Sequence, residues 1–443
     1  MKLFRAKYVF FGVILITAIL SCSGCSRGKL RFDYSGDTGS VIPYPDARFA
    51  VISDIHLYDP ALGSSGAAFE KTLNSDRKLL LDSIDLLDYA INELIASGVE
   101  IVLIPGDLTK DGEMANHRIV AEKLKKLKAA GIAVFVVPGN HDINNPDAVS
   151  YSGDIGTPVP SISAADFAQI YADYGFSAAL KRDDDSLGYV VEPLEGLWLL
   201  CLDACRYREN VPGKTEIVSS KISQKTAGWI AGVLKDAAAQ KKAVMAMMHH
   251  GVVEHWKGQA KLHPDYLIEG YGDFGRFLAS WNVRLVFTGH YHAQDITLAK
   301  FGDKFIYDIE TGSLVTAPCP MRYLELKNNS LQIRTDTIVE KIHPGTDFAP
   351  NAHAFVKKTV MLEAIGTLKS YKVSEKDSDY IADTLGYAFA AHYNGDENPS
   401  LRPPFDSSRL NLWGRIVYKT QDYVFDGLWA DQLPPDNNAR LEF

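Results

Sequence analysis

Phe49-Ala-Val-Ile-Ser-Asp-Ile-His56 joins a short apolar run directly to an Asp-x-His motif, and this stretch decides the fold class of the chain. A continuous apolar run of this length predicts a strand that is buried on both faces, as strands of parallel sheets are. Polar side chains that come directly after such a strand lie at its carboxyl end. Two more apolar runs, 101–104 and 134–137, are followed in the same way by Gly106-Asp107 and by Gly139-Asn-His-Asp142.

Amphipathic segments separate these apolar runs. Residues 78–97 carry apolar side chains at helical spacing and end at Gly98. Residues 113–130 form a second helical segment, with a lysine-rich face that we interpret as solvent-exposed, and Gly131 ends it. Both ends match the common glycine stop of a helix. Strands that alternate with helices in this order predict an α/β fold with a largely parallel sheet and helices on its faces.

The rest of the chain continues this pattern and then changes it. Further strands are predicted at 196–202, 243–248 and 285–287, with helices at 223–240 and 271–281. After Ala293 the apolar residues alternate with polar ones, which predicts antiparallel strands of a second sheet at 305–309, 323–326 and 331–338. Helical spacing returns at 354–370, 377–392 and 407–428. We therefore predict a core domain at 47–345 and a small helical C-terminal domain at 346–443.

The 443 residues have the composition of an ordinary globular protein, with 46% hydrophobic and 23% charged residues. That apolar content excludes both a disordered chain and a small disulfide-stapled scaffold. A formal net charge of -9 argues against general nucleic-acid binding, which requires a basic face. Nothing predicts sequence-specific nucleic-acid binding or a protein partner. A small anionic substrate remains compatible, because bound metal ions supply positive charge locally.

The first 22 residues have the pattern of a bacterial lipoprotein signal peptide. Lys2, Arg5 and Lys7 precede an apolar run at 8–20 that is short for a membrane span. The run ends at Cys22, where a lipobox would be cleaved and the cysteine lipidated; Cys25 is a second candidate, and an uncleaved transmembrane anchor is the alternative. Residues 23–46 are interpreted as a flexible stalk. We expect an exported protein that is lipid-anchored to the cell membrane, or to the outer membrane facing the periplasm or exterior.

Three cysteines remain beyond the leader, at Cys201, Cys205 and Cys319. An odd number predicts no disulfide framework. Cys201 and Cys205 could pair in an oxidising compartment, but we expect buried free thiols.

Five short polar blocks follow predicted strands, and they hold six of the twelve histidines. The blocks are Asp54-Ile-His56, Gly106-Asp107, Gly139-Asn-His-Asp142, His249-His250 and Gly289-His-Tyr-His292. Because the carboxyl ends of strands in open α/β sheets converge on one crevice, we expect these blocks to meet. Carboxylate, imidazole and amide donors without thiolates suit hard or borderline divalent metals.

The spacing within the blocks indicates how their side chains reach one cavity. On an extended backbone, Asp-x-His and His-x-His each direct both polar side chains to the same side. Gly106, Gly139 and Gly289 allow the chain to turn sharply where a metal approaches the backbone. Two metals about 3.5–4 Å apart, bridged by one carboxylate, would clamp an in-line displacement at phosphorus.

The ordered set of these blocks resembles the calcineurin-like metallophosphoesterase superfamily over roughly residues 47–340. Each block alone is a weak signal, but the ordered set after predicted strands is highly specific. With its leader and helical extension, the chain looks closest to bacterial class III cyclic-nucleotide phosphodiesterases. The resemblance implies a four-layer α/β/β/α sandwich with a small helical C-terminal domain. It also implies a hydrolase that uses two divalent metal ions, which Mn, Fe or Zn could supply.

The resemblance implies a role for each matching residue. The first metal would be bound by Asp54, His56, Asp107 and His292, and the second by Asp107, Asn140, His249 and His290, with Asp107 bridging. His141 would donate a hydrogen bond or a proton to the phosphoryl or leaving-group oxygen, and Asp142 would orient His141. A hydroxide between the metals would attack phosphorus. The family's usual His-x-Pro is here His249-His250-Gly251, which leaves both histidines open as the ligand.

The implied substrate is a small phosphodiester, best matched by a cyclic nucleotide. An exported nucleotidase, a general phosphodiesterase and a sphingomyelinase-like enzyme are alternatives, since one fold hosts many substrates. A protein phosphatase is disfavoured by the expected export. A non-catalytic surface binding protein would have lost metal ligands, and none is missing.

Several residues outside the blocks have two interpretations. We interpret His117 as a surface residue, with the crevice mouth as the alternative. The first group of aromatic residues could stack on a nucleobase or simply pack, and we favour packing: Trp256, Tyr266 and Tyr271. The C-terminal aromatic residues could wall a pocket or form that domain's core, and we favour core: Tyr371, Tyr380, Tyr387, Tyr393 and Trp413.

Overall fold

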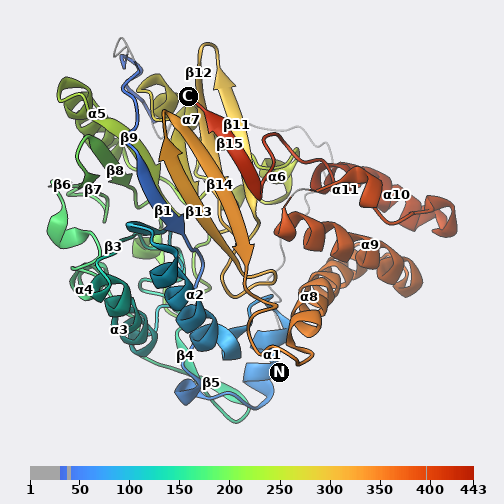
Figure 1. Ribbon diagram of the computed structural model, residues 1–443. Helices are drawn as coiled ribbons and strands as arrows, with labels where there is room; N and C mark the ends of the chain where they lie inside the picture. Colours follow the sequence, from blue (N-terminus) through green and yellow to red (C-terminus); the bar gives the residue numbers. More distant parts are fainter. Residues whose placement is uncertain (1–29, 37–40, 396) are drawn as a thin grey trace, which may run out of the picture.

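Two β-sheets pack face to face, with helices outside each, in the computed structural model of the chain (Figure 1). The structure describes residues 30–36, 41–395 and 397–443. The predicted leader, with Cys22 and Cys25, lies outside the described residues, as does part of the predicted stalk. The rings of Phe49 and Phe287, one from each sheet, meet edge to face at 5.4 Å in the core between the sheets.

The first sheet holds the strands that precede the first three polar blocks. Its order is β15-β14-β13-β1-β2-β3. The central strands β1, β2 and β3 run parallel, and β13 pairs antiparallel with β1. The bounds are β1 (Ala47–Val51), β2 (Ile101–Ile104), β3 (Ala133–Val136), β13 (Pro320–Lys327), β14 (Ser330–Thr337) and β15 (Asn438–Glu442).

The second sheet holds the strands that precede the last two blocks. Its order is β11-β12-β10-β9-β8-β7-β6, with β8, β9, β10 and β12 parallel and the others antiparallel. The bounds are β6 (Lys181–Arg182), β7 (Tyr189–Leu194), β8 (Leu197–Cys201), β9 (Ala243–Met247), β10 (Leu285–Thr288), β11 (Asp295–Phe301) and β12 (Lys304–Glu310).

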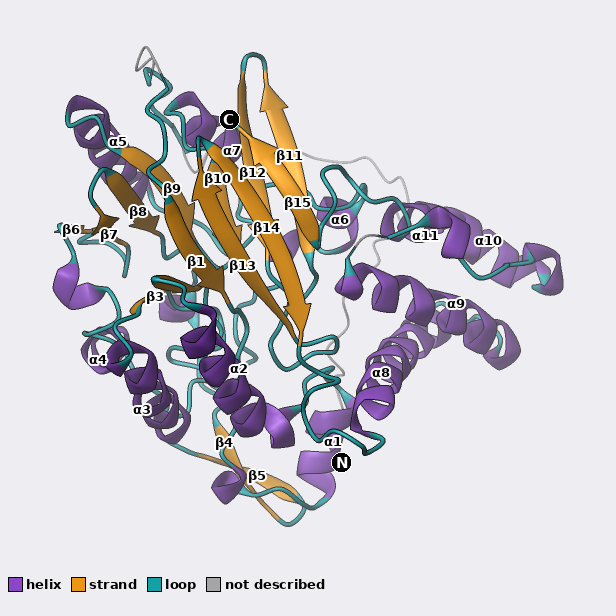
Figure 2. Ribbon diagram, in the orientation of Figure 1, coloured by secondary structure: helices purple, strands orange, loops and turns teal. Residues whose placement is uncertain are grey.

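The four-layer α/β/β/α arrangement predicted from the sequence is confirmed (Figure 2). Helices α2 (Ser83–Ser97) and α3 (Met114–Ala129) pack on the first sheet, and α5 (Gln224–Ala239) and α7 (Tyr271–Ser280) pack on the second. Helix α2 ends at Gly98, which adopts the left-handed conformation expected of a helix stop.

One prediction about the second sheet is wrong in part. Only β12 of the three predicted antiparallel strands lies in that sheet, where it is parallel to β10 and antiparallel to β11. Strands β13 and β14 extend the first sheet instead, because the segment after β12 crosses back to β1. Alternation of apolar and polar residues predicts a strand with one apolar and one polar face. It does not predict the sheet to which that strand belongs.

Several smaller elements complete the core. The hairpin β4 (Val149–Ser152) and β5 (Ile155–Pro158) forms a separate two-stranded sheet. The short helices are α1 (Ala67–Asn74), α4 (Ala164–Ile170) and α6 (Gln259–Leu262). Helix α4 begins with a capping box between Ser163 and Asp166.

The C-terminal helices form a group at one side of the sheets, as Figure 1 shows. They are α8 (Phe348–Ser370), α9 (Glu375–Asn394), α10 (Leu412–Thr420) and α11 (Asp422–Leu428). They share a small apolar cluster of their own, yet Val356, Phe389 and Leu428 also belong to the main core. The last residues are not helical: β15 pairs with β14 as the edge strand of the first sheet. The boundary at 345/346 stays a prediction.

The described residues of the predicted stalk at 23–46 contact the rest of the protein, and the stalk itself stays a prediction. Phe32 stacks on Phe277 of α7 with ring centroids 4.9 Å apart, and the indole of Trp281 donates to the carbonyl of Asp33. Aromatic side chains in this segment therefore bind it to the outer face of the second sheet's helices. Among the described residues, no helix combines the length and apolar composition that crossing a bilayer requires.

The three described cysteines are free thiols, as expected. Cys201 and Cys319 are buried, and the Cys205 thiol lies 3.5 Å from the carbonyl of Pro138.

Candidate metal centre

The carboxyl ends of strands from both sheets bring the polar blocks together. Asp54 follows β1, Asp107 follows β2, Asn140 follows β3, His249 follows β9 and His290 follows β10. All five side chains are buried. The backbones of neighbouring blocks are hydrogen-bonded to one another, for example from the N–H of Asp54 to the carbonyl of Gly106. Backbone hydrogen bonds therefore continue from the paired strands into the blocks and fix the blocks relative to one another.

Asp54, His56 and His292 form one group of possible metal ligands. The Nε2 atoms of His56 and His292 are 3.1 Å apart. The Oδ1 atom of Asp54 lies 3.3 Å from His292 Nε2 and 3.8 Å from His56 Nε2. One carboxylate oxygen and two imidazole nitrogens therefore face a common point.

Asp107, His249 and His290 form a second group, and Asn140 adjoins it. His249 Nε2 lies 3.2 Å from Asp107 Oδ2 and 3.2 Å from Asn140 Oδ1. The same Asp107 Oδ2 is 3.5 Å from His56 Nε2, which belongs to the first group. Asp107 is thus the residue that joins the two groups, as a bridging carboxylate must be.

The donor sets fit divalent metal ions. Metal–nitrogen and metal–oxygen bonds of about 2.0–2.2 Å place two donors on one ion roughly 2.9–3.5 Å apart. Most of the separations above fall in this range. His290 Nε2 is buried and has no hydrogen-bond partner, an arrangement that is costly unless a ligand satisfies it. The described residues therefore supply two adjoining sites for divalent cations.

The geometry favours His249 over His250 as the ligand. The Nδ1 atom of His249 is 2.8 Å from the carbonyl of Pro105, so it is the protonated nitrogen and Nε2 is free to face Asp107 and Asn140. By contrast, His250 Nε2 lies 2.8 Å from the carbonyl of Val218. The second histidine thus points its Nε2 away from the carboxylates.

The backbone at these residues is not extended, and in this respect the prediction is wrong. Residues of the Asp-x-His, Gly-Asp and His-x-His motifs have positive φ angles: Asp54 (49°), His56 (39°), Asp107 (50°), His290 (77°) and His292 (67°). Such conformations cost non-glycine residues of order 1–3 kcal/mol each, and they persist where surrounding structure enforces them. The chain therefore turns at each ligand position instead of continuing the strand.

Two glycines leave room for carboxylates of the centre. A Cβ atom on Gly139 would lie 2.0 Å from Asp107 Oδ1, and one on Gly289 would lie 2.3 Å from Asp54 Oδ2. Neither contact is possible, so the carboxylates occupy space that any other residue would fill. This close approach explains why glycine precedes the ligands in both blocks.

Replacing Gly139 with alanine should lower turnover by about 10²-fold, because displacement of a catalytic group by about 1 Å has an effect of that size. The matched control is Gly228→Ala in α5, where no atom lies within 4 Å of the added Cβ. That change should leave turnover intact and stabilise the helix by about 0.5–1 kcal/mol. Steady-state kinetics and thermal unfolding of both variants check this, and equal activity of the two would contradict it.

His141 is oriented by Asp111 and not by Asp142, which corrects the role predicted for Asp142. The Nδ1 atom of His141 lies 2.8 Å from Asp111 Oδ1, and its backbone N–H donates to Asp107 Oδ1 at 3.0 Å. Asp142 instead accepts hydrogen bonds from the backbone N–H groups of Leu108, Thr109 and Gly139. Asp142 therefore ties the second block to the third.

Asp111 is the site residue that the sequence did not reveal. It lies five positions beyond Gly106 in a loop, where no periodicity indicates its direction. The only available signal is its position in Asp107-Leu-Thr-Lys-Asp111, directly after a recognised block.

Opposing charges set the protonation of the centre. Burial raises the pKa of Asp107, but the imidazoles of His249, His141 and His56 outweigh it and hold that pKa well below its usual range. Burial and Lys78 lower the pKa of His141. The negative charges of Asp107 and Asp111 outweigh them and raise this pKa to about 9. Burial, followed by Lys78, keeps the pKa of His56 well below its usual range. Without bound metal, the carboxylates therefore favour the protonated form of His141, whereas burial favours the neutral form of His56.

His117 is buried and does not lie on the surface, so that interpretation is wrong. Its Nε2 atom is 2.8 Å from the carbonyl of Asp142, and its Nδ1 atom is 2.8 Å from the hydroxyl of Tyr171. Burial lowers the pKa of His117 to about 3. A neutral His117 therefore supports the third block through the carbonyl of Asp142. The lysine-rich sequence of its helix did not predict this buried position.

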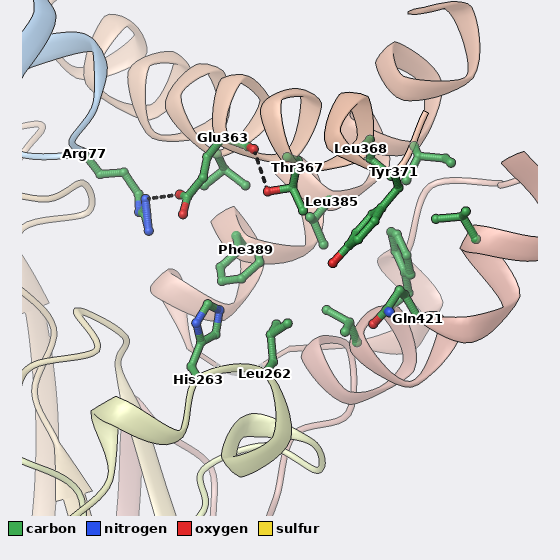
Figure 3. Close-up of a pocket in the computed structure, with 16 residues that line it drawn as sticks. Arg77, Leu262, His263, Glu363, Thr367, Leu368, Tyr371, Leu385, Phe389 and Gln421 are labelled. Atoms are coloured by element: carbon green, nitrogen blue, oxygen red, sulfur yellow. Dashed lines mark hydrogen bonds and ion pairs between the residues drawn. The ribbon is translucent and has the colours of Figure 1, made fainter. Parts of the chain in front are cut away.

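An apolar cavity of about 90 Å³ lies between the C-terminal helices and the core (Figure 3). Its walls include Phe389 and Leu385 of α9, Tyr371 after α8, and His263 after α6. Arg77 lies at one end, where it is paired with Glu363 at 3.0 Å.

Only a thin layer separates this cavity from the candidate ligands. The ring of Tyr266 is 4.5 Å from that of His290 on one side and 5.5 Å from that of His263 on the other. Lys78 follows Arg77 directly in the sequence, and its charge lowers the pKa of both His56 and His141. The cavity and the metal centre are therefore adjacent.

Some of the aromatic residues that had two interpretations pack in the core, and others lie near the metal ligands or the cavity. Trp256 is buried and donates to the hydroxyl of Tyr291, and Tyr271 packs against the second sheet's outer cluster. Tyr266 instead contacts the candidate ligand His290. In the C-terminal region Tyr371 lines the cavity and Tyr393 accepts a hydrogen bond from Arg77.

The remaining three C-terminal aromatic residues lie away from the cavity. Tyr380 stacks on Phe405, and Tyr387 and Trp413 are exposed.

Known proteins provide comparisons for this arrangement. The chain is 27% identical over 140 residues to a probable cyclic nucleotide phosphodiesterase of Xenorhabdus bovienii (strain SS-2004). That match covers 28% of this chain and spans only half the length of the relative.

Among solved structures, a dimetal phosphatase from Danio rerio has a TM-score of 0.46 and 17% identity, covering 66% of this chain and 97% of that one. A purple acid phosphatase from yellow lupin has a TM-score of 0.41 and 12% identity, covering 67% and 52%. The sequence model of the calcineurin-like phosphoesterases matches residues 47–294, more than half of the chain. The chain therefore belongs to the calcineurin-like phosphoesterase family.

Proposed function

We propose that this protein hydrolyses a small phosphodiester, with a cyclic nucleotide as the best candidate, at a centre of two divalent metal ions. The observation that carries the proposal is the position of Asp107 Oδ2, which is 3.2 Å from His249 Nε2 and 3.5 Å from His56 Nε2. A single carboxylate oxygen shared by two ligand groups is the arrangement expected of a two-metal hydrolase.

The residues that would hold the ions are Asp54, His56, Asp107 and His292 for one, and Asp107, Asn140, His249 and His290 for the other. When bound, such ions neutralise a phosphate group and make water a stronger nucleophile at neutral pH. Their identity as Mn, Fe or Zn follows from availability, since this ligand set suits each.

The protein's own contribution to the chemistry is centred on His141. Its ring lies 4.9 Å from that of His56 at the edge of the first group, and the carboxylates of Asp107 and Asp111 raise its pKa in the absence of metal. A protonated imidazole in this position can stabilise charge on a phosphoryl oxygen and give its proton to a leaving alkoxide. The hydrogen bond to Asp111 keeps Nε2 of His141 directed outward for this task.

The adjacent cavity supports a substrate with a sizeable organic group. Tyr266 and His263 lie between the candidate ligands and the cavity, and we propose that their rings offer surfaces on which a nucleobase can stack. The partial similarity to a probable cyclic nucleotide phosphodiesterase points to the same substrate class. We propose that the organic part of the diester lies along these rings and enters the cavity.

A metal-supplemented activity panel tests the proposed function. Purified protein is supplied with Mn²⁺, Fe²⁺ or Zn²⁺ and assayed against cyclic nucleotides, nucleoside monophosphates and a generic phosphodiester such as bis(p-nitrophenyl) phosphate. We expect cyclic nucleotides to give the highest kcat/KM. Preference for monophosphates would make the protein a nucleotidase, and absence of any metal-dependent turnover would overturn the proposal.

Filling the cavity should separate nucleotide binding from chemistry. Ala364→Phe places a ring in the cavity wall on α8, and it should raise KM for a cyclic nucleotide at least about tenfold while leaving the generic diester unaffected. Ala354→Phe on the exposed face of the same helix is the matched control. Equal KM values for the two variants would remove the cavity from the substrate site.

We further propose that the protein is exported and tethered by a lipid on Cys22. The support is the basic, apolar and lipobox order of residues 1–22. Labelling cells with a fatty acid analogue should mark the wild type and the Cys25→Ser variant but not Cys22→Ser. The opposite pattern would move the anchor to Cys25, and absence of label from all three would disprove lipidation.

A further inference from the structure

A second cluster of buried metal-ligand side chains lies outside the dinuclear centre. Asp295, His392 and Glu397 have ligand atoms within 4.8 Å of one another, and the same holds for Glu397, Asp431 and Asp436. Glu397 belongs to both groups and therefore joins them. The residues come from β11, the end of α9, and the loops before and after α10 and α11.

This cluster is built into the interior and is not a surface patch of acids. Asp295, His392, Glu397 and Asp436 are all more than nine-tenths buried. His392 Nδ1 contacts Glu397 Oε1, and the other carboxylate oxygen of Glu397, Oε2, is buried without a hydrogen-bond partner. Since an unpaired polar atom in the interior is costly, the Oε2 atom of Glu397, the member shared by both groups, favours a bound cation at this point.

The surroundings hold the cluster in a fixed arrangement. His255 Nδ1 is 2.7 Å from Asp295 Oδ1, and the backbone N–H of Ile296 donates to Asp436 Oδ1 at 2.8 Å. Hydrogen bonds from neighbouring groups to ligand carboxylates are typical of metal sites, where they orient the ligands. The buried guanidinium of Arg322 donates to the backbone carbonyls of Asp436 and Asp295.

The local charges leave a negative excess for a cation to balance. The nearby imidazole of His255 already faces three carboxylates: its Nδ1 is 2.7 Å from Asp295 Oδ1, and its Nε2 is 3.4 Å from Asp308 Oδ2 and from Glu310 Oε2. Burying carboxylates without a partner is unfavourable unless they bind metal or take up protons. Three or four carboxylates with one imidazole suit Mn²⁺ or Zn²⁺ better than Ca²⁺, which prefers oxygen ligands alone.

We propose that Glu397, with Asp295 and His392 on one side and Asp431 and Asp436 on the other, binds a divalent cation, distinct from the dinuclear centre, which fastens the C-terminal region to the core. The site adjoins the catalytic blocks: Asp295 is three positions after His292, and the His392 ring packs edge-on against Tyr291 at 5.6 Å. It also joins the end of α9 to the segment that leads into β15. The ion therefore has a structural role, and it takes no part in the reaction.

Counting bound Mn²⁺ per chain tests this site independently of activity. Metal-free full-length protein is titrated with Mn²⁺, and free ion is quantified by electron paramagnetic resonance. We expect three ions for wild type, two for Glu397→Gln, one for Asp107→Asn and none for the double variant. Glu375→Gln, which removes an exposed acid from the first turn of α9, is the matched control and should bind three.

Thermal unfolding provides the second readout. Mn²⁺ should raise the unfolding midpoint of Asp107→Asn but not that of the double variant, because only the remaining site can bind the native state. Equal Mn²⁺ counts in wild type and Glu397→Gln would overturn the proposal. A count that falls by one in Glu397→Gln but is unchanged in Asp107→Asn would leave this site standing and reject the dinuclear centre.

Discussion

Replacing Asp107 with asparagine should lower phosphodiester turnover by more than about 10³-fold and remove both metals of the dinuclear centre. The reason is geometric: one oxygen, Oδ2, lies 3.2 Å from His249 Nε2 and 3.5 Å from His56 Nε2. An amide in its place carries no charge and bridges two cations poorly. The substitution retains an oxygen for the N–H of His141, so the loop that carries this histidine should stay in place. Metal analysis and steady-state kinetics on the same preparation measure both effects.

Variants that lose a ligand from only one of the two groups make the test specific. His292 contacts only the first group and His249 contacts the second, so His292→Ala and His249→Ala should each reduce the metal content by one ion. Asp107→Asn should reduce it by two. Circular dichroism and the unfolding midpoint confirm that each variant is folded. If Asp107→Asn lost only one ion, or kept its turnover, Asp107 would not be the bridge.

The layer order of the fold could be predicted because its strands are short, continuous apolar runs. The runs at 101–104 and 134–137 became β2 and β3 with boundaries shifted by no more than one residue. Strand β11 was missed because it begins with Asp295 and carries Thr297 and Lys300, so its apolar residues form no continuous run. The pairing of β13 with β1 was missed for a different reason: it joins residues more than 270 positions apart, and no local pattern carries that information.

The candidate ligands could be predicted because each lies at a fixed offset from a strand end. The turns that present them could not, since positive φ at Asp54 or His290 depends on contacts between blocks and not on local preference. Asp111 and His117 show the same limit. Both lie within one loop and helix after β2, yet one orients His141 and the other braces Asp142 from behind. Their roles follow from tertiary packing alone.

Replacing His141 with alanine should slow catalysis by about 10²–10⁴-fold, the usual effect of losing a general acid, while both metals stay bound. His141 lies within reach of His56 and Asp107, but the two ligand groups keep their own members without it, because Asp107 still meets His56 and His249 directly. The defect should be larger for a cyclic nucleotide, whose leaving alkoxide needs a proton, than for bis(p-nitrophenyl) phosphate, whose leaving group does not. Equal defects on the two substrates would mean that His141 stabilises phosphoryl charge and donates no proton.

Asp111→Asn should move the alkaline limb of the pH–rate profile to lower pH. As the proposed general acid, His141 would act in its protonated form, so turnover should be present below its pKa and be lost as pH rises through that value. Burial opposes protonation of His141, but the negative charges of Asp107 and Asp111 raise its pKa to about 9. An asparagine at position 111 keeps a hydrogen-bonding group near Nδ1 but removes one of these charges, so protonated His141 becomes less stable.

The double variant separates this effect from a general structural one. In an Asp111→Asn, His141→Ala protein, the change at Asp111 should have little further effect, because its action passes through His141. If Asp111→Asn lowered turnover equally at every pH, and did so with His141 absent as well, then Asp111 would support the loop after β2 through its ion pair with Lys110. A shifted limb that disappears with His141 instead identifies Asp111 as the residue that sets the proton affinity of the general acid.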